Sequence, residues 1–500
     1  MLTRRSLLHS SSAALLAGVA APRLLFAAGD TATVGQWSPV QSWPCVAVHL
    51  HLLPTSSHES AKLLAYGNET NPVTKQKADY TKSFVVDIPT DGQPLSSVIK
   101  VENFETNLFC CGHAFLPDGR LITMGGHVVK NYYGSSDINI FDHQPTYRWE
   151  LQSASLNSGR WYPSIITLPS GEALVLSGTM VGSTQPNPLP QVWQTGGGLR
   201  SLTGAQLALK NYPKIFVLPD GRVYHVGPEP QTRFLNTAGL GSWQNGPKRK
   251  AAMRGYGVAV QYDDNKIMTA GGASGAGPTA TAEVIDLSAT APQWRWTNPM
   301  AFARRHANAT LLPDGTVLVT GGSNSADFNN AAGAILAAEL WDPVTERWTT
   351  MASGASPRIY HSTAVLLPDG RVLWTGGGSP PPKNGKSNNN AEIFSPPYLF
   401  KGPRPNVTGA PAAASLGSTF DVSCADASSI GAVNLLRIGS VTHTFNMNQR
   451  IVRLAFATKS GGLRVTLPSD RNRLVPGHYM LFAISTAGVP SIGRMLQVAA

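Results

Sequence analysis

A repeated β-hairpin is the feature that most limits what this chain can fold into. Its clearest copy spans residues 357–378, PRIYHSTAVLLPDGRVLWTGGG, in which two apolar strands flank a Pro-Asp-Gly turn and a glycine run follows. Alternating hydrophobicity on both sides of a tight turn is the pattern of two antiparallel strands. Five similar segments precede this copy, and they begin at His113, Ser164, Pro213, Tyr256 and His306. The chain is therefore expected to be all-β.

The spacing of these hairpins predicts how they assemble. The glycines that close them recur at intervals of roughly 50 residues, as in kelch repeats, where each repeat forms one four-stranded blade of a β-propeller. A degenerate copy that begins at Val46 supplies a further blade, expected to occupy residues 31 to about 100. We therefore predict a seven-bladed kelch-type β-propeller over residues 31–397.

The repeat pattern ends near residue 398. From 398 to 500 the glycine-closed hairpins give way to short alternating strands such as FDVSC, AVNLLRIG and HYMLFAIS. Regular short strands with turn signals over about 100 residues are typical of an immunoglobulin-like β-sandwich. This second domain is expected to carry His443 in a connection between two strands.

The N-terminal residues 1–27 have the pattern of an export signal. A basic start, an apolar middle and a small-residue end are typical of a signal peptide, and Arg4-Arg5 fits the twin-arginine type. A general secretory signal with two arginines by chance is the alternative. No later apolar run is long enough to span a membrane. The protein is therefore expected to be periplasmic or secreted, without a transmembrane segment.

Charge and cysteine content argue against a nucleic-acid-binding protein and against a disulfide-rich protein. The formal charge of +11 is scattered along the chain and no nucleic-acid-binding motif is present, so nucleic acid is not expected as a partner. Four cysteines are too few for a disulfide framework. Cys45 and Cys424 could pair, and a vicinal bridge between Cys110 and Cys111 is a further alternative. A monomer is expected.

Aligning the hairpins on one another brings out a candidate site. Because propeller blades are related by rotation, equivalent positions form a ring at one height along the axis. Counting back seven residues from the turn proline, or its equivalent, reaches Cys110, Tyr162, Tyr212, Tyr256, His306 and His361. Tyr360 immediately precedes the last of these. Packing between blades would favour small or aliphatic residues here, so side chains that can bind a metal predict a functional site.

Copper is the metal that this set of side chains favours. Cu(II) prefers nitrogen and oxygen ligands, which imidazole and phenolate groups supply. The ring offers Tyr162, Tyr360 and His361, and His443 could join them if the last domain leans over the mouth of the propeller. The alternative is that His443 is an ordinary loop residue. Cys110 and Tyr162 belong to adjacent blades, so their side chains could touch.

Four short motifs resemble those of the copper radical oxidases, the family of galactose oxidase and glyoxal oxidase. The similarity covers nearly all of residues 37–498 and is closest to bacterial members that resemble glyoxal oxidase. The motifs are Phe109-Cys110-Cys111-Gly112, Arg160-Trp161-Tyr162-Pro163, Arg358-Ile359-Tyr360-His361-Ser362 and Thr442-His443-Thr444.

The resemblance implies a chemistry. Cys110 and Tyr162 would be joined by a thioether, and Tyr162 would be both the radical and an equatorial copper ligand. Tyr360 would be the axial ligand and the base, and His361 and His443 would be the imidazole ligands. One copper ion and the thioether-linked tyrosyl radical would then oxidise a primary alcohol or hydrated aldehyde, and dioxygen would become hydrogen peroxide without an organic cofactor. The alternative is a non-catalytic kelch propeller that binds glycan or protein at the cell envelope.

The substrate is predicted from the departures from galactose oxidase. A sugar-binding module before the propeller is missing, Gly178-Thr179-Met180 replaces a stacking tryptophan, and no basic residue is evident near Asn211-Tyr212-Pro213. A small aldehyde or primary alcohol is therefore expected rather than galactose, with a glycan end as the alternative. Residues expected to line the pocket, or else to pack, are Tyr212, Tyr256 and His306. The indole that shields the radical could belong to Trp161, Trp193 or Trp243.

Overall fold

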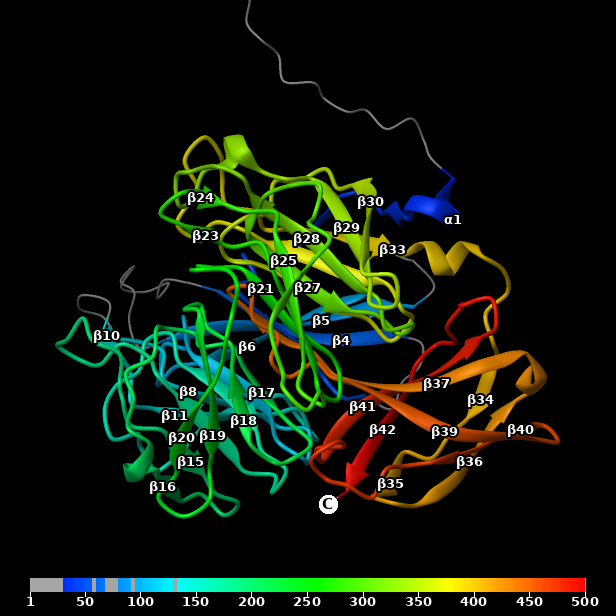
Figure 1. Cartoon of the computed structure of the whole chain (residues 1–500), viewed down its shortest axis with the longest axis horizontal. Helices are drawn as coiled ribbons and strands as arrows, with labels where there is room; N and C mark the ends of the chain where they lie inside the picture. Colours follow the sequence, from blue (N-terminus) through cyan, green and yellow to red (C-terminus); the bar gives the residue numbers. More distant parts are fainter. Residues whose placement is uncertain (1–29, 56–59, 68–79, 91–94, 129–132, 500) are drawn as a thin grey trace, which may run out of the picture.

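The computed structural model describes residues 30–55, 60–67, 80–90, 95–128 and 133–499. The predicted signal peptide lies outside these residues. Seven sheets of four or five antiparallel strands form the blades of a propeller, and a second β domain follows at the C-terminal side of the chain (Figure 1). The predicted all-β fold, a seven-bladed propeller followed by a β-sandwich, is therefore confirmed. No helix in the described part of the chain is long and apolar enough to cross a membrane.

Blades two to six follow the repeats in order, from the axis outward. Blade two contains β7 (Gly112–Phe115), β8 (Leu121–Met124), β11 (Ile138–Asp142) and β12 (Arg148–Leu151). Blade three contains β13 (Ser164–Thr167), β14 (Ala173–Leu176), β15 (Gln191–Trp193) and β16 (Leu199–Ser201). Blade four contains β17 (Ile215–Val217), β18 (Val223–His225), β19 (Gln231–Asn236) and β20 (Ser242–Lys248). Blade five contains β21 (Val258–Asp263), β22 (Lys266–Ala270), β25 (Ala282–Asp286) and β26 (Arg295–Thr297). Blade six contains β27 (Arg305–Leu311), β28 (Val317–Ser323), β29 (Ala337–Asp342) and β30 (Arg347–Ser353).

Two blades contain strands from distant parts of the chain. Blade seven has β31 (Ser362–Leu366), β32 (Val372–Gly376) and β33 (Asn390–Ser395), and its outer strands are β1 (Gln36–Trp37) and β2 (Gln41–Ser42). The expectation that residues 36–42 belong to the first blade is therefore wrong. Pairing the chain start with the last blade closes the ring and covers the edge of β33.

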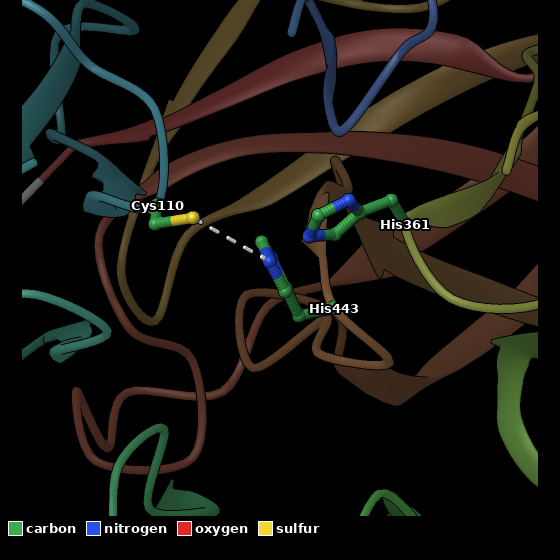
Figure 2. A group of neighbouring side chains, drawn as sticks. All are labelled: Cys110, His361 and His443. Atoms are coloured by element: carbon green, nitrogen blue, oxygen red, sulfur yellow. Dashed lines mark hydrogen bonds between the residues drawn. The ribbon is translucent and has the colours of Figure 1, made fainter. Parts of the chain in front are cut away.

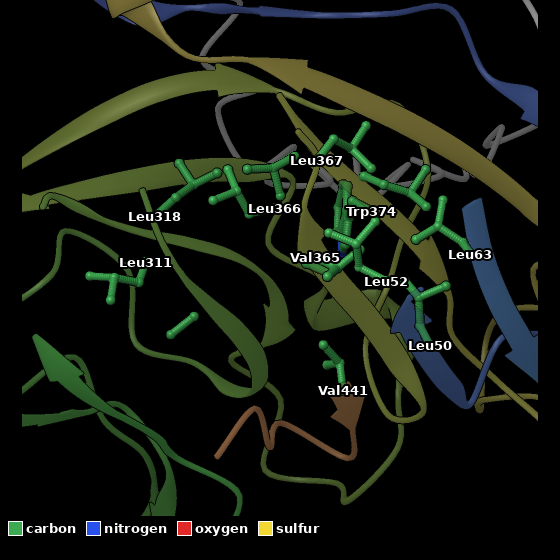
Figure 3. Packing of buried hydrophobic residues seen from close by; sticks show 14 of the residues in the cluster. Leu50, Leu52, Leu63, Leu311, Leu318, Val365, Leu366, Leu367, Trp374 and Val441 are labelled. Carbon is green, nitrogen blue, oxygen red and sulfur yellow. The ribbon is translucent and has the colours of Figure 1, made fainter. Parts of the chain in front are cut away.

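Blade one receives a strand from the C-terminal domain. Its own strands are β3 (His49–Leu52), β4 (Ser60–Tyr66), β5 (Thr81–Pro89) and β6 (Ser97–Asn103), and β38 (Ser440–Thr442) pairs with β3 on the inner side. Val441 of β38 lies in the same apolar cluster as Leu50, Val365 and Trp374 (Figure 3). The C-terminal domain is thus anchored inside the propeller.

The rest of the C-terminal domain is one run of hydrogen-bonded strands with its own core. The strand order is β34 (Val407–Gly409), β36 (Thr419–Cys424), β40 (Gly462–Thr466), β39 (Ile451–Lys459), β37 (Ile430–Arg437), β41 (Gly477–Ser485), β42 (Arg494–Ala499) and β35 (Ala413–Ser415). Its separate apolar cluster includes Leu435, Leu463 and Leu481. The short α1 (Thr31–Val34) precedes the propeller, and a 3-10 turn at Pro397–Phe400 links the two domains.

A buried arginine–glutamate pair recurs in the later blades. Arg304 contacts Glu339 at 2.6 Å with both side chains fully buried, and Arg254–Glu283 and Arg358–Glu392 repeat the arrangement at 2.9 Å and 3.1 Å. Each arginine also donates to a carbonyl of its blade's glycine run, as Arg304 does to that of Gly321. The pairs therefore fix the segments that lead into the ring positions.

Loss of one such pair is expected to destabilise the propeller. Glu339→Gln leaves the Arg304 guanidinium buried without a counter-ion, which typically costs about 3–5 kcal/mol. The exposed pair of Lys383 and Asp327 is the matched control, and Asp327→Asn should cost far less, because water solvates both charged groups. Urea unfolding of the three proteins measures both effects. Equal losses of unfolding free energy in the two variants would show that the buried pair stabilises the propeller no more than the exposed pair does.

Candidate metal centre

The six predicted ring residues share one unusual backbone conformation. Their φ values lie between 47° and 68°, in the left-handed region, and the residues are Cys110, Tyr162, Tyr212, Tyr256, His306 and His361. Residues other than glycine are uncommon in this region and are held there only where the surrounding structure enforces it. Hydrogen bonds between blades do so: the Tyr162 amide donates to the Cys110 carbonyl at 3.0 Å, and the Tyr212 amide to that of Tyr162 at 2.8 Å.

His443 reaches this ring through β38. Thr442 at the end of that strand pairs with His49 of β3, and the chain turns at His443, whose φ is 46°. The His443 side chain is 1% exposed, and its ring centroid lies 4.5 Å from that of His361. Sulfur or nitrogen atoms of Cys110, His361 and His443 all lie within 4.8 Å of one another (Figure 2). The last domain therefore contributes to the site by inserting a strand.

Hydrogen bonds place the proton on the same nitrogen of both imidazoles. His361 Nδ1 lies 2.8 Å and 2.9 Å from the carbonyl oxygens of Gly378 and Ser379, which only accept, so Nδ1 carries the proton. His443 Nδ1 lies 2.5 Å from Thr442 Oγ1, whose own proton goes to the Val48 carbonyl at 2.8 Å. Nε2 therefore has the lone pair in both residues. His361 Nε2 is buried without a hydrogen-bond partner among the described residues.

Two phenols complete the site. The hydroxyl oxygens of Tyr162 and Tyr360 lie 2.5 Å apart, and the Tyr360 ring stacks on His361 with centroids 3.8 Å apart. Burial raises the pKa of both phenols well above their ordinary value. Burial also lowers the pKa of His361 to about 4 and that of His443 well below its ordinary value. The protein alone thus presents neutral imidazoles and neutral phenols.

The two neighbouring cysteines have different surroundings. Cys110 Sγ lies 3.7 Å from His443 Nε2, and the Cys110 amide donates to His49 Nε2 at 3.1 Å. Cys111 Sγ instead lies 3.5 Å from the Tyr66 hydroxyl, and burial raises its pKa to about 12. All four cysteines are within the described residues and none forms a disulfide. Both disulfide alternatives, Cys45 with Cys424 and Cys110 with Cys111, are therefore wrong.

These residues fit a copper ion. Copper favours imidazole nitrogen and phenolate oxygen, and two Nε2 lone pairs and two phenol oxygens converge here. The second imidazole nitrogens donate to a carbonyl or a hydroxyl, as they do in protein metal sites where such contacts fix the ring orientation. The orphaned His361 Nε2 is explained if it binds a metal.

One indole lies against the Tyr162 ring. Trp161 stacks on Tyr162 with centroids 3.9 Å apart and an angle of 29° between the planes. Trp193 packs in the core of blades two and three, and Trp243 donates its Nε1 hydrogen to the Ala205 carbonyl. Of the three indoles considered from the sequence, the structure selects Trp161.

A cavity of about 220 Å³ opens beside Tyr162. Tyr212 and Tyr256 line it, whereas the His306 ring centroid lies 5.1 Å from that of Tyr360 and His306 is not part of the lining. Lys210 and Lys214 also line the cavity. The interpretation that no basic residue is available beside residues 211–213 is therefore wrong. The sequence does place Lys210 and Lys214 on either side of this stretch. A single sequence does not show in which direction their side chains point.

Comparisons with known proteins agree with this geometry. Residues 242–398 match the model of the glyoxal oxidase N-terminus, and residues 404–498 match that of the galactose oxidase-like early set domain. Galactose oxidase of Gibberella zeae is 27% identical over 505 residues, which cover 93% of this chain and 71% of the relative. The aldehyde oxidase GLOX of Vitis pseudoreticulata is 28% identical over 466 residues, which cover 84% of this chain and 86% of the relative.

A solved structure matches almost the whole chain. It is described as a novel fungal alcohol oxidase with catalytic diversity among the AA5 family, in complex with copper. It is 25% identical, with a TM-score of 0.81, over 94% of this chain and 100% of the other. Together with the domain matches, this similarity supports the placement of the chain in the copper radical oxidase family of galactose oxidase and glyoxal oxidase.

Proposed function

We propose that this protein is an exported copper radical oxidase that oxidises a small aldehyde, as its hydrate, or a primary alcohol. The observation that carries the proposal is one buried site that holds the Nε2 lone pairs of His361 and His443 together with two phenol oxygens 2.5 Å apart. A propeller used only for binding would not need to bury His361 Nε2 without a partner among the described residues, because an unpaired buried polar atom costs free energy. The relatives named as oxidases favour the same conclusion.

The proposed roles follow from the positions of the side chains. His361 and His443 would hold copper through Nε2, and Tyr162 and Tyr360 through their phenol oxygens. Copper would supply one redox equivalent and the charge that favours phenolate over phenol. Tyr360 would then accept the proton of the substrate hydroxyl, as a general base. Tyr162, as a radical, would take a hydrogen atom from the carbon that bears that hydroxyl.

The second redox equivalent would reside on Tyr162. A thioether to Cys110 would donate electron density to the ring, and stacked Trp161 would keep water away from it. The overall reaction balances as RCH(OH)₂ + O₂ → RCOOH + H₂O₂, and for a primary alcohol as RCH₂OH + O₂ → RCHO + H₂O₂. Dioxygen therefore receives both electrons and both hydrogens.

The proposal predicts a higher kcat/KM for small aldehydes than for galactose. The cavity of about 220 Å³ is smaller than the 300–1,000 Å³ of typical drug-sized sites. The site also lacks the stacking indole that would orient a hexose, because Gly178-Thr179-Met180 stands in its place. A large polar substrate depends on such orientation for specificity. Initial rates of peroxide release with glyoxal, methylglyoxal, glycolaldehyde and galactose decide the question. Copper-free protein is the control, and a clear preference for galactose would contradict the prediction.

A further inference from the structure

His49 is a buried imidazole beside the candidate metal centre that the proposed chemistry does not use. It lies on β3, the inner strand of blade one, and its Nε2 accepts the amide hydrogen of Cys110 at 3.1 Å. Its Nδ1 therefore carries the ring proton, and this atom is buried without a hydrogen-bond partner among the described residues. An unpaired buried N–H group costs free energy. An apolar residue would avoid that cost, so the Nε2 lone pair is the physical reason for a histidine at this position.

The imidazole of His49 replaces a backbone carbonyl of the ring. One blade further on, the Tyr162 amide donates to the carbonyl of the preceding ring residue, Cys110. The same count of seven back from the turn proline reaches Ala47 in blade one. Ala47 does not have the left-handed backbone of the ring residues, and its carbonyl accepts a hydrogen bond from Thr363 Oγ1 at 3.0 Å. The Cys110 amide therefore bonds to a side chain instead.

This hydrogen bond supports an unfavourable backbone conformation of Cys110. Its φ is 64°, a value that residues other than glycine keep only where their surroundings enforce it. In this conformation the Cys110 thiol lies 3.7 Å from His443 Nε2, on the side of the metal centre (Figure 2). The thiol of Cys111 instead lies 3.5 Å from the Tyr66 hydroxyl. The His49 ring stacks on that of Tyr66 with centroids 4.6 Å apart, so one imidazole contacts the supports of both cysteines.

We propose that His49 is a positioning residue that keeps the thiol of Cys110, rather than that of Cys111, directed at the metal centre. This inference rests on the proposed function, in which a thioether joins Cys110 to Tyr162. As the S–C bond forms, the thiol hydrogen and one hydrogen of the Tyr162 aromatic ring are lost. Dioxygen takes both hydrogens and both electrons and becomes hydrogen peroxide. His49 itself does not react, but without its lone pair the Cys110 backbone relaxes and turns the thiol away.

The rate of cross-linking in the full-length protein tests this role. Protein produced without copper is loaded with Cu(II) in air, and intact-mass measurement follows the loss of two hydrogens. His49→Phe keeps an aromatic ring against Tyr66 but removes the acceptor, and it should slow cross-linking at least about tenfold, as expected for the loss of one buried hydrogen bond. His49→Gln places an amide oxygen as many bonds from the backbone as Nε2, and it should cross-link faster than His49→Phe. Copper affinity, measured by competition with a chelator, should be equal in all three proteins, because His49 is not a proposed ligand.

His225→Phe is the matched control, because it removes an equally buried imidazole from β18 of blade four. It should leave the rate of cross-linking unchanged. His49→Leu, which also lacks an acceptor, serves as a second variant if His49→Phe does not fold. Equal rates in the wild-type protein and His49→Phe would overturn the inference. A His49→Gln variant as slow as His49→Phe would overturn it too, because the acceptor would then not be what matters.

Crystal structures of the copper-free wild-type protein and of copper-free His49→Phe give a result that does not depend on oxidase chemistry. In the variant the Cys110 φ should leave the left-handed region, and its sulfur should move away from His443. An unchanged Cys110 would overturn the inference. If copper-loaded wild-type protein did not lose two hydrogens, the proposed radical role of Tyr162 would fail, but the two structures would still decide whether His49 positions Cys110.

Discussion

Copper loading of the purified protein in air is expected to lower its mass by two hydrogens and to join Cys110 to Tyr162. The Tyr162 amide donates to the Cys110 carbonyl at 3.0 Å, so the two residues are adjacent across neighbouring blades. The S–H hydrogen and one ring hydrogen would be lost as the S–C bond forms, and dioxygen would take both electrons to become hydrogen peroxide. Intact-mass measurement followed by peptide mapping checks the site of the bond.

The neighbouring cysteine provides the control for this experiment. Cys111→Ser should still lose two hydrogens, because the Cys111 thiol lies against Tyr66 and its pKa is raised to about 12. Cys110→Ser should show no change in mass and should lose oxidase activity. Full activity in a protein without the cross-link would contradict the proposed redox role of Tyr162.

Removal of the His443 imidazole is expected to weaken copper binding by at least about 100-fold and to abolish turnover. Loss of a residue that merely orients a ligand typically costs 10–100-fold in metal affinity, so loss of a ligand should cost at least as much. Thr442→Val tests the smaller effect, because Thr442 Oγ1 accepts the Nδ1 hydrogen of His443. Competition with a copper chelator measures affinity in His443→Ala, Thr442→Val and the wild-type protein.

A matched histidine outside the site shows whether the effect is specific. His478 lies on β41 of the same domain, and His478→Ala should leave copper affinity unchanged. Circular dichroism and thermal unfolding would confirm that the variants keep the fold. If His443→Ala binds copper as tightly as the wild-type protein, then His443 is a structural residue and the proposed metal centre is wrong.

The sequence alone determined the propeller and most of the ring. Each hairpin is a local unit, in which period-two hydrophobicity and a tight turn specify two paired strands without help from the rest of the chain. Rotation between equivalent blades then brings equivalent residues together, which is why counting back from each turn reached Cys110, Tyr162 and His361. Their shared left-handed backbone confirms that they occupy one structural position.

Tertiary structure decided what the repeat could not. Ser440 of β38 bonds to His51 across 389 positions of the chain, and no local pattern indicates that a strand of the second domain enters the propeller beside β3. The same holds for the pairing of β1 and β2 with β33, which depends on closing the ring. Side-chain direction was also undetermined, because it depends on packing between blades. Only the fold therefore selected Trp161 over two other indoles and placed the Lys214 side chain in the cavity beside Tyr162.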